Sequence, residues 1–149
     1  MKKVTLIGII AFMIMFIVGV VVATQFGEKS PIYFHAKLSL DDKLTKRASG
    51  HRVLFITLFD ENSPRPMPYG ATRFVLPKAP EGNFINLSIT HENLQLMSQG
   101  QDHPQKFRVK ARLDGDGQAG KDQAGDIVGI KENVEYGSTN IEILLNEVK

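Results

Sequence analysis

Apolar and polar residues alternate with a period of two in several parts of this chain, and two segments show the pattern most clearly. In residues 32–40 the apolar positions are Ile32, Phe34, Ala36, Leu38 and Leu40. In residues 107–114 the apolar positions are Phe107, Val109, Ala111 and Leu113, and between them lie Arg108, Lys110, Arg112 and Asp114. Because neighbouring side chains of a strand point to opposite faces of a sheet, each segment is predicted to be a strand with one buried face. The basic face of the second strand is predicted either to be solvated or to bind something acidic.

The remaining pattern predicts more short strands and little helix. Residues 52–59 are apolar at both alternating sets of positions, which predicts a central strand covered on both faces. Shorter strand-like segments, separated by Gly and Pro turns, lie at residues 71–76, 83–89, 127–130 and 139–148. Thr90 can cap one helical turn that runs through Met97, the only helix expected in this part of the chain. Without strand–helix–strand alternation, this order predicts an all-β fold, an antiparallel β-sandwich of about six or seven strands.

The N-terminal segment has a different pattern, because residues 4–23 are apolar, small or Thr at every position. A helix of about 20 residues is about 30 Å long, the thickness of a bilayer core. We therefore expect a transmembrane helix at residues 4–23, with residues 1–3 in the cytoplasm, 24–31 as a linker and 32–149 as a domain in the bacterial periplasm. The alternative is a signal peptide cleaved after Val21-Val22-Ala23, but the long apolar run favours an inner-membrane anchor.

Composition excludes several classes of function. The chain has 149 residues and a formal charge of +2, with 18 basic and 16 acidic residues mixed along it. This length suits one domain after the N-terminal segment. No basic block of the kind that follows a phosphate backbone is present, so nucleic acid is not expected as a partner. The lack of Cys excludes disulfides, thiolate catalysis, thiolate metal sites and c-type haem attachment.

Candidate metal ligands are present but poorly arranged. The four histidines fall in different predicted elements and are His35, His51, His91 and His103. One Gly-containing loop carries Asp114, Asp116, Asp122 and Asp126. Oxygen-rich loops can bind Ca²⁺, but this spacing does not match an EF-hand loop, so these carboxylates are weak candidates and a solvated loop is favoured. No nucleophile elbow, phosphate-binding loop or dinucleotide fingerprint occurs, and the sequence predicts no catalytic residues, no enzyme and no cofactor.

A proline-containing loop is the candidate partner-binding site. It follows the predicted central strand and consists of Arg65, Pro66, Met67, Pro68 and Tyr69. Two prolines stiffen the loop, which is expected to expose the Met and the Tyr to a partner. The alternative is an edge-strand bend whose Met packs into the core.

Several motifs, in this order, resemble one protein family. Val53-Leu54-Phe55-Ile56 is followed by Arg65-Pro66-Met67-Pro68, by Arg73, by "ITHENLQLM" at 89–97 and by "FRVKARLDGDGQAGKDQAGDIVG" at 107–129. Together they resemble the C-terminal Ig-like β-domain of the bacterial cytochrome c-type biogenesis protein that handles apocytochrome c for haem ligation. The resemblance covers residues 32–148 and implies an Ig-like sandwich in an inner-membrane, periplasm-facing accessory factor. The chain has no tetratricopeptide region and one predicted span where the family typically has two, so it resembles only the β-domain.

These observations favour a membrane-anchored interaction module that binds apocytochrome c or a component of the haem-ligation complex. An edge strand or the loop at residues 65–69 would contact the unfolded or membrane-bound partner. Edge pairing supplies main-chain hydrogen bonds without requiring one side-chain sequence, which suits a protein that handles polypeptides. The alternative hypothesis is a periplasmic metal-binding protein that uses the Asp-rich loop or the histidines.

Overall fold

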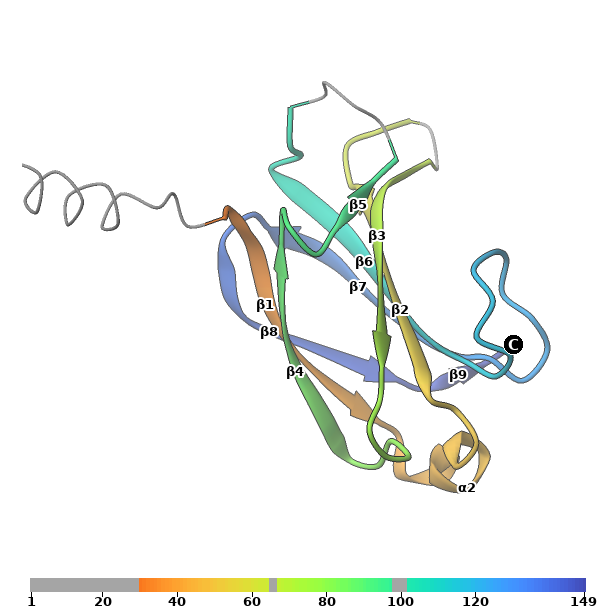
Figure 1. Ribbon diagram of the computed structural model, residues 1–149. Helices are drawn as coiled ribbons and strands as arrows, with labels where there is room; N and C mark the ends of the chain where they lie inside the picture. Colours follow the sequence, from red (N-terminus) through yellow and green to blue (C-terminus); the bar gives the residue numbers. More distant parts are fainter. Residues whose placement is uncertain (1–29, 65–66, 98–101) are drawn as a thin grey trace, which may run out of the picture. The chain divides into compact units, whose positions relative to one another are not determined.

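The strands of the molecule account for most of its regular structure. The computed structural model describes residues 30–64, 67–97 and 102–149 (Figure 1). In this part of the chain the strands are β1 (Ile32–Leu40), β2 (Val53–Asp60), β3 (Pro68–Val75), β4 (Asn83–Thr90), β5 (Gln95–Leu96), β6 (Lys106–Asp114), β7 (Ile127–Glu135), β8 (Ser138–Leu145) and β9 (Glu147–Val148). A short 3-10 helix, η1 (Asp42–Leu44), continues into α2 (Thr45–Ala48). The predicted all-β fold is confirmed.

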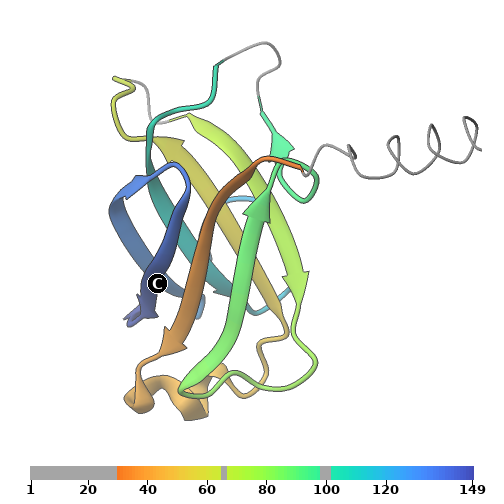
Figure 2. The same ribbon diagram turned by 90° about the vertical axis from the view of Figure 1, so that its left-hand side faces the viewer.

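The strands form two sheets that face each other across one core (Figure 2). The smaller sheet has the order β4-β1-β8, and the larger sheet has the order β5-β3-β2-β6-β7-β9. Every pairing is antiparallel except that of β1 with β8, which is parallel. The predicted sandwich is therefore confirmed, but the described residues form nine strands where about six or seven were expected, because the two-residue strands β5 and β9 are too short to show a pattern in the sequence. Antiparallel pairing holds for all pairs except β1 with β8, because after the turn at residues 136–137 the chain leaves the larger sheet and β8 lies beside β1 in the smaller sheet.

The core is built from the inward faces of the alternating segments. Leu38 of β1, Leu54 of β2 and Leu113 of β6 are fully buried, and Leu54 pairs directly with Leu113. A register shift between Ile32 and Phe34 turns Tyr33 inward as well. The period-two pattern thus predicted the core side of β6 and of β1 from Phe34 onward, whereas Ile32, expected on the buried face, is 40% exposed.

One lateral edge of the sandwich is closed at the corner between β7 and β8. After β8 ends, the Asn146 N–H donates to the Val128 carbonyl at 3.2 Å, and β9 then pairs with β7. Gly129 of β7 lies against the backbone of β8, and a Cβ atom there would lie 2.8 Å from the carbonyl carbon of Leu144. Only a glycine allows the two backbones to come this close.

Of the expectations about helices, the one at Thr90 is correct only in part. The Thr90 hydroxyl accepts from the Asn93 N–H at 3.4 Å, as expected of a cap. After Thr90 the chain makes a single turn, in which the Leu94 N–H donates to the Thr90 carbonyl at 3.1 Å. It does not continue as a helix, because Leu94 is buried in the core and Gln95–Leu96 pair with β3 as β5. The helix that does form, α2, was not expected. It follows η1, where the Asp41 carboxylate accepts from the Lys43 N–H at 2.9 Å, and it buries Ala48.

The predicted transmembrane helix at residues 4–23 lies outside the described residues, as do residues 1–3 and 24–29 of the linker. Within the part of the chain that the structure describes, no helix is long and apolar enough to cross a membrane. Residues 31–149 form the compact unit to which all the following contacts belong.

Candidate functional site

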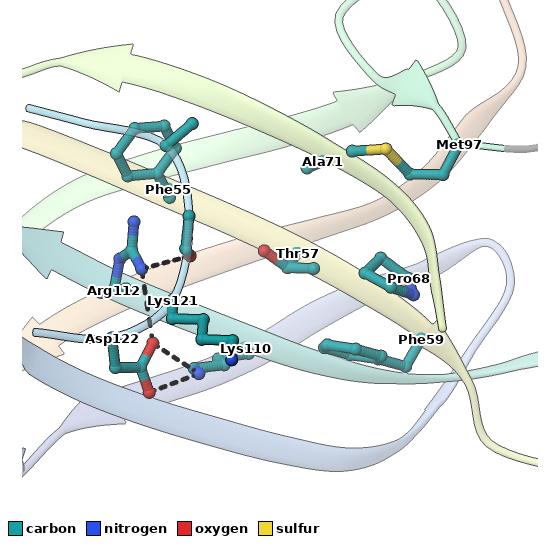
Figure 3. Close-up of a pocket in the computed structure, with 12 residues that line it drawn as sticks. Phe55, Thr57, Phe59, Pro68, Ala71, Met97, Lys110, Arg112, Lys121 and Asp122 are labelled. Carbon is teal, nitrogen blue, oxygen red and sulfur yellow. Dashed lines mark hydrogen bonds and ion pairs between the residues drawn. The ribbon is translucent and has the colours of Figure 1, made fainter. Parts of the chain in front are cut away.

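A groove on the outer face of the larger sheet is the candidate functional site (Figure 3). Its floor is Phe55, Thr57 and Phe59 of β2, and its volume is about 510 Å³. The described residues around this floor come from β3, from the end of β5, from β6 and from the loop after β6; they are Pro68, Ala71, Met97, Lys110, Arg112, Ala119, Gly120, Lys121 and Asp122. We call this surface the outer groove.

The floor exists because β2 is apolar on both faces. Leu54, Ile56 and Leu58 point into the core and are fully buried, as expected for a central strand. Phe55 and Phe59 point outward and are only half-buried. The prediction that β2 is covered on both faces is therefore correct for the inner face and only partly correct for the outer face, where aromatic rings remain accessible to a partner.

Two arginines of β6 pack over these rings. The Arg108 guanidinium lies 5.0 Å from the centre of the Phe59 ring, and the Arg112 guanidinium lies 4.9 Å from the centre of the Phe55 ring. Positive charge is attracted to the face of an aromatic ring. The outer groove thus combines aromatic surface with basic side chains.

Arg112 is the best buried of these basic residues, because the loop after β6 folds back over it. Only 5% of Arg112 is exposed. Its Nη2 lies 3.0 Å from Asp114 Oδ2, its Nη1 lies 3.4 Å from Asp122 Oδ1, and its Nε lies 3.7 Å from Asp126 Oδ2. It also donates to the carbonyls of Gly120 at 2.8 Å and Gln118 at 3.1 Å. The loop is therefore held in place by Arg112, and Lys110 adds an ion pair to Asp122 at 2.6 Å.

The carboxylates of this cluster are perturbed in opposite directions. Burial raises the pKa of Asp114, and a hydrogen bond that its protonated carboxyl donates to the Asp116 carboxylate acts in the same direction. Burial would also raise the pKa of Asp122, but hydrogen bonds and charges from Lys110 and Arg112 outweigh it and lower that pKa. A backbone hydrogen bond from Gln118 lowers the pKa of Asp116. Such perturbed groups can mark an active site, but an ion-pair network that holds a loop produces the same shifts.

Aspartates of the loop and the basic face of β6 form ion pairs with each other. The basic face binds something acidic, one of the two predicted outcomes, and the acidic groups come from the same chain. A guanidinium occupies the position among Asp114, Asp122 and Asp126 where a bound cation would have to lie. Among residues 30–64, 67–97 and 102–149, no group of three or more His, Asp or Glu side chains is placed to hold a metal ion. Asp116 is exposed and accepts a local hydrogen bond from the Gln118 N–H at 2.8 Å.

The proline-containing loop contributes to the outer groove only in part. Arg65 and Pro66 lie outside the described residues. Met67 is 62% exposed, as expected, and Pro68 lines the outer groove. The expected exposure of Tyr69 is wrong, because the extra residue at the register shift between Leu58 and Phe59 turns it inward. Its hydroxyl lies 3.2 Å from the Tyr33 hydroxyl, and burial raises the pKa of Tyr33.

The four histidines have separate partners. His35 Nδ1 lies 2.7 Å from Ser88 Oγ, His51 Nε2 lies 3.1 Å from the Gly125 carbonyl, and His91 Nδ1 lies 3.2 Å from the Tyr33 hydroxyl. His103 stacks on Tyr136 with 4.2 Å between ring centres. Each histidine thus supports a local contact in its own part of the fold.

Sequence reasoning missed four residues of the outer groove. The sequence predicts that Phe55 and Phe59 are covered and that Met97 belongs to a helical turn, and it does not distinguish Lys121 from the rest of its loop. One signal was present: β2 has aromatic residues at the outward positions and aliphatic residues at the inward positions. In an outer strand face that is fully solvated, such aromatic positions are unusual.

Comparisons with known proteins give no relative: no family model, no curated protein and no solved structure matches this chain. The resemblance to the β-domain of the cytochrome c-type biogenesis family therefore stays a prediction.

Proposed function

We propose that this protein is a non-enzymatic polypeptide-binding module, anchored in the bacterial inner membrane by residues 4–23 with its sandwich in the periplasm. The observation that supports this best is the outer groove, which presents the half-buried rings of Phe55 and Phe59 on the solvent side of a sheet. Exposed apolar surface beside polar groups is typical of sites that bind other proteins.

The chemistry of the outer groove favours an apolar segment with acidic neighbours. Pro68, Ala71 and the half-exposed Met97 extend the apolar surface beyond the two rings. Met side chains adapt to partners of different shape, which suits the binding of unfolded chains. Lys121 is exposed at the border, and Arg108 has no acidic partner among the described residues. The proposed partner therefore carries apolar side chains for the floor and carboxylates for the border.

The sequence resemblance also suggests that the sandwich is Ig-like, and we include this in the proposal. The partner that the resemblance suggests is apocytochrome c or a component of the haem-ligation complex. An apocytochrome is an unfolded polypeptide, so it can offer an extended segment. A membrane anchor raises the effective concentration of the domain near partners in the same membrane, so that modest affinity is sufficient.

The test is binding of a labelled apocytochrome c to the full-length chain in detergent, measured by fluorescence anisotropy. In the native protein we expect saturable binding. Met97→Ser is expected to weaken it about tenfold, because burying a methionine side chain is worth about 1.5 kcal/mol or more. Leu144→Ser is the matched control, since Leu144 is 47% exposed but lies on β8, outside the outer groove.

Two results would contradict the proposal. If the native chain binds neither apocytochrome c nor any apolar, acidic peptide, the polypeptide-binding function fails. If Met97→Ser and Leu144→Ser weaken binding equally, the outer groove is not the binding site. If such a peptide binds and apocytochrome c does not, the polypeptide-binding function stands but apocytochrome c is excluded as the partner.

A further inference from the structure

The edge of β3 next to the outer groove is only half occupied. β5 pairs with β3 at Gly70 and Ala71 and nowhere else, so it lies beside one end of the strand (Figure 1). Among the described residues, Thr72 to Val75 have a strand partner in β2 on one side and none on the other. An edge strand of this kind presents unpaired backbone groups to a partner.

The register shows which backbone groups are free. The Leu76 N–H donates to the Arg52 carbonyl at 2.7 Å, in line with the antiparallel register of β3 and β2. In such a pair the residues alternate between those bonded to the partner and those facing away, so Thr72 and Phe74 are bonded to β2. The N–H and C=O of Arg73 and Val75 then point to the open edge. The bond from the Met97 N–H to the Tyr69 carbonyl, at 3.0 Å, is on this same side.

The side chains at the open edge define what can bind there. Val75 is 64% exposed, and Arg73 is exposed opposite Phe55 on the face of the outer groove. Within the described chain no carboxylate forms an ion pair with Arg73. A strand that fits this edge therefore carries an acidic residue opposite Arg73 and an apolar residue opposite Val75. The backbone of these two partner residues forms hydrogen bonds with the backbone of Arg73 and Val75.

We infer that the polypeptide partner binds by strand addition: an extended segment pairs antiparallel with Thr72 to Val75 of β3, collinear with β5. This inference rests on the proposed polypeptide-binding function and states its geometry. The antiparallel direction follows from the larger sheet, in which every pairing is antiparallel. Because β3 runs from Arg73 to Val75, the partner's apolar residue comes first in its sequence, and its acidic residue follows two positions later. A second copy of this chain fits less well, because it would bring a second Arg73 to the same short edge.

The probe is a short peptide that contains valine, threonine and glutamate in this order, with threonines on both sides. In one methylated form the backbone nitrogens of valine and glutamate carry methyl groups, and these are the two amides that would face β3. In the other form the threonine nitrogens next to them are methylated instead, and those face away. We expect the second form to bind the full-length chain in detergent as the unmodified peptide does. The first form is expected to bind more than about tenfold more weakly, because two backbone hydrogen bonds are lost.

The matching change in the protein is Val75→Pro, which removes the N–H that faces the open edge. Val75→Thr keeps this N–H and is the control. We expect Val75→Pro to weaken peptide binding about fivefold or more, and Val75→Thr to leave it within about twofold. Tyrosine fluorescence checks that both variants are folded, because all three tyrosines, Tyr33, Tyr69 and Tyr136, lie in the sandwich.

The outcomes separate this inference from the proposed function. If the unmodified peptide binds and both methylated forms bind equally well, strand addition is wrong and polypeptide binding stands. If the chain binds apocytochrome c but not the peptide, the assigned edge chemistry is wrong while the function again stands. If the native chain is a dimer that Val75→Pro converts to a monomer, the edge is occupied by a second copy and the inference is overturned. If no polypeptide binds at all, both fail.

Discussion

The two lateral edges of the sandwich differ in how the strands at each edge are covered. At one edge the chain passes directly from β8 of the smaller sheet into β9 of the larger sheet, and β9 pairs with β7 at Ile127 and Val128. At the other edge β3 is covered over two residues by β5, and Thr72 to Val75 have no strand partner beyond β2 in the part of the chain that the structure describes. Stable β proteins generally protect their edges, because a free edge can pair with another chain. An edge that is left free beside an aromatic groove is therefore better understood as a binding feature than as a defect.

The closed edge is reinforced from the loop that holds Arg112. The Lys149 N–H donates to the Asp126 carbonyl at 2.9 Å, and the Gly125 N–H donates to the Lys149 carbonyl at 2.9 Å. The loop between β6 and β7 is thus bonded both to Arg112 and to the end of the chain after β9. The open edge has no comparable cluster of buried charges among the described residues. We therefore expect changes at the closed side to affect mainly stability, and changes at the open side to affect mainly binding.

The largest effect is expected from Arg112→Met. The change leaves Asp114 and Asp126, which are 2% and 3% exposed, as buried carboxylates without their main counterion. Breaking a buried pair in this way costs about 3 to 5 kcal/mol of the free energy of unfolding. Urea unfolding of the full-length chain, followed by tyrosine fluorescence, measures it.

Arg108→Met is the matched control for Arg112→Met, on the same strand face. Arg108 stacks on Phe59 but makes no ion pair within the described residues. Its replacement is expected to cost about 1 kcal/mol or less. Equal losses in the two variants would show that the buried charges do not support the closed side.

Gly129→Ala is expected to destabilise the protein somewhat less, by about 2 to 3 kcal/mol, because overpacking forces a backbone shift. The new Cβ would meet the backbone of Leu144 and Leu145, and backbone cannot move aside as a flexible side chain can. Gly50→Ala is the control, since a Cβ there meets nothing within 4 Å. The same urea titration compares them, and an unaffected Gly129→Ala variant would mean that the corner is not tightly packed.

The difference between the edges could be predicted from the sequence only in part. Strict alternation identified the core faces of β1 and β6, because side-chain direction in a strand depends only on neighbouring residues. The parallel position of β8 beside β1, and the change of sheet at Asn146, depend on contacts between residues far apart in the sequence. The sandwich was therefore predictable, but the strand pairings at its two edges were not.

In the outer groove, too, contacts between individual residues could not be predicted from the sequence. The charge of Arg112 and the four aspartates were visible in the sequence, but their distances and the direction of the loop were not. The pattern of carboxylates favours a solvated loop over a metal site. This expectation is wrong for Asp114 and Asp126, which are 2% and 3% exposed, because Arg112 lies among the aspartates and forms ion pairs with them. Tyr69 was predicted to be exposed for a similar reason, since one extra residue in a strand reverses the side to which a side chain points.

A smaller effect is expected from Asp122→Asn, and it depends on pH. The pKa of Asp122 is lowered in the folded protein, so its ionised form stabilises the fold above its unfolded pKa of about 3.9, and this contribution disappears as the pH falls through the folded pKa. At pH 7 the variant should lose about 1 to 2 kcal/mol, since Asp122 is bonded to both Lys110 and Arg112.

Urea titrations of both proteins from about pH 7 to about pH 2 provide the measurement. The difference between native and variant should be constant near neutral pH and should shrink between about pH 5 and about pH 2. Asp114 contributes with the opposite sign, because its pKa is raised, but it is present in both proteins and its contribution largely cancels in the difference. A difference that does not change with pH would exclude Asp122 as an ionised partner of the closed side.

The smallest effect on stability is expected at the open edge, from Val75→Pro. A proline is tolerated where the missing N–H points to solvent, so we expect a change of less than about 0.5 kcal/mol in the free energy of unfolding. Thr72→Pro is the sharpest comparison, because the Thr72 N–H faces β2 and its loss should cost about 3 kcal/mol. Urea unfolding of the two variants therefore tests whether the Thr72 N–H faces β2 and the Val75 N–H faces the open edge. If Val75→Pro is as damaging as Thr72→Pro, the backbone of Val75 is already paired in the free protein, and this edge is closed like the other.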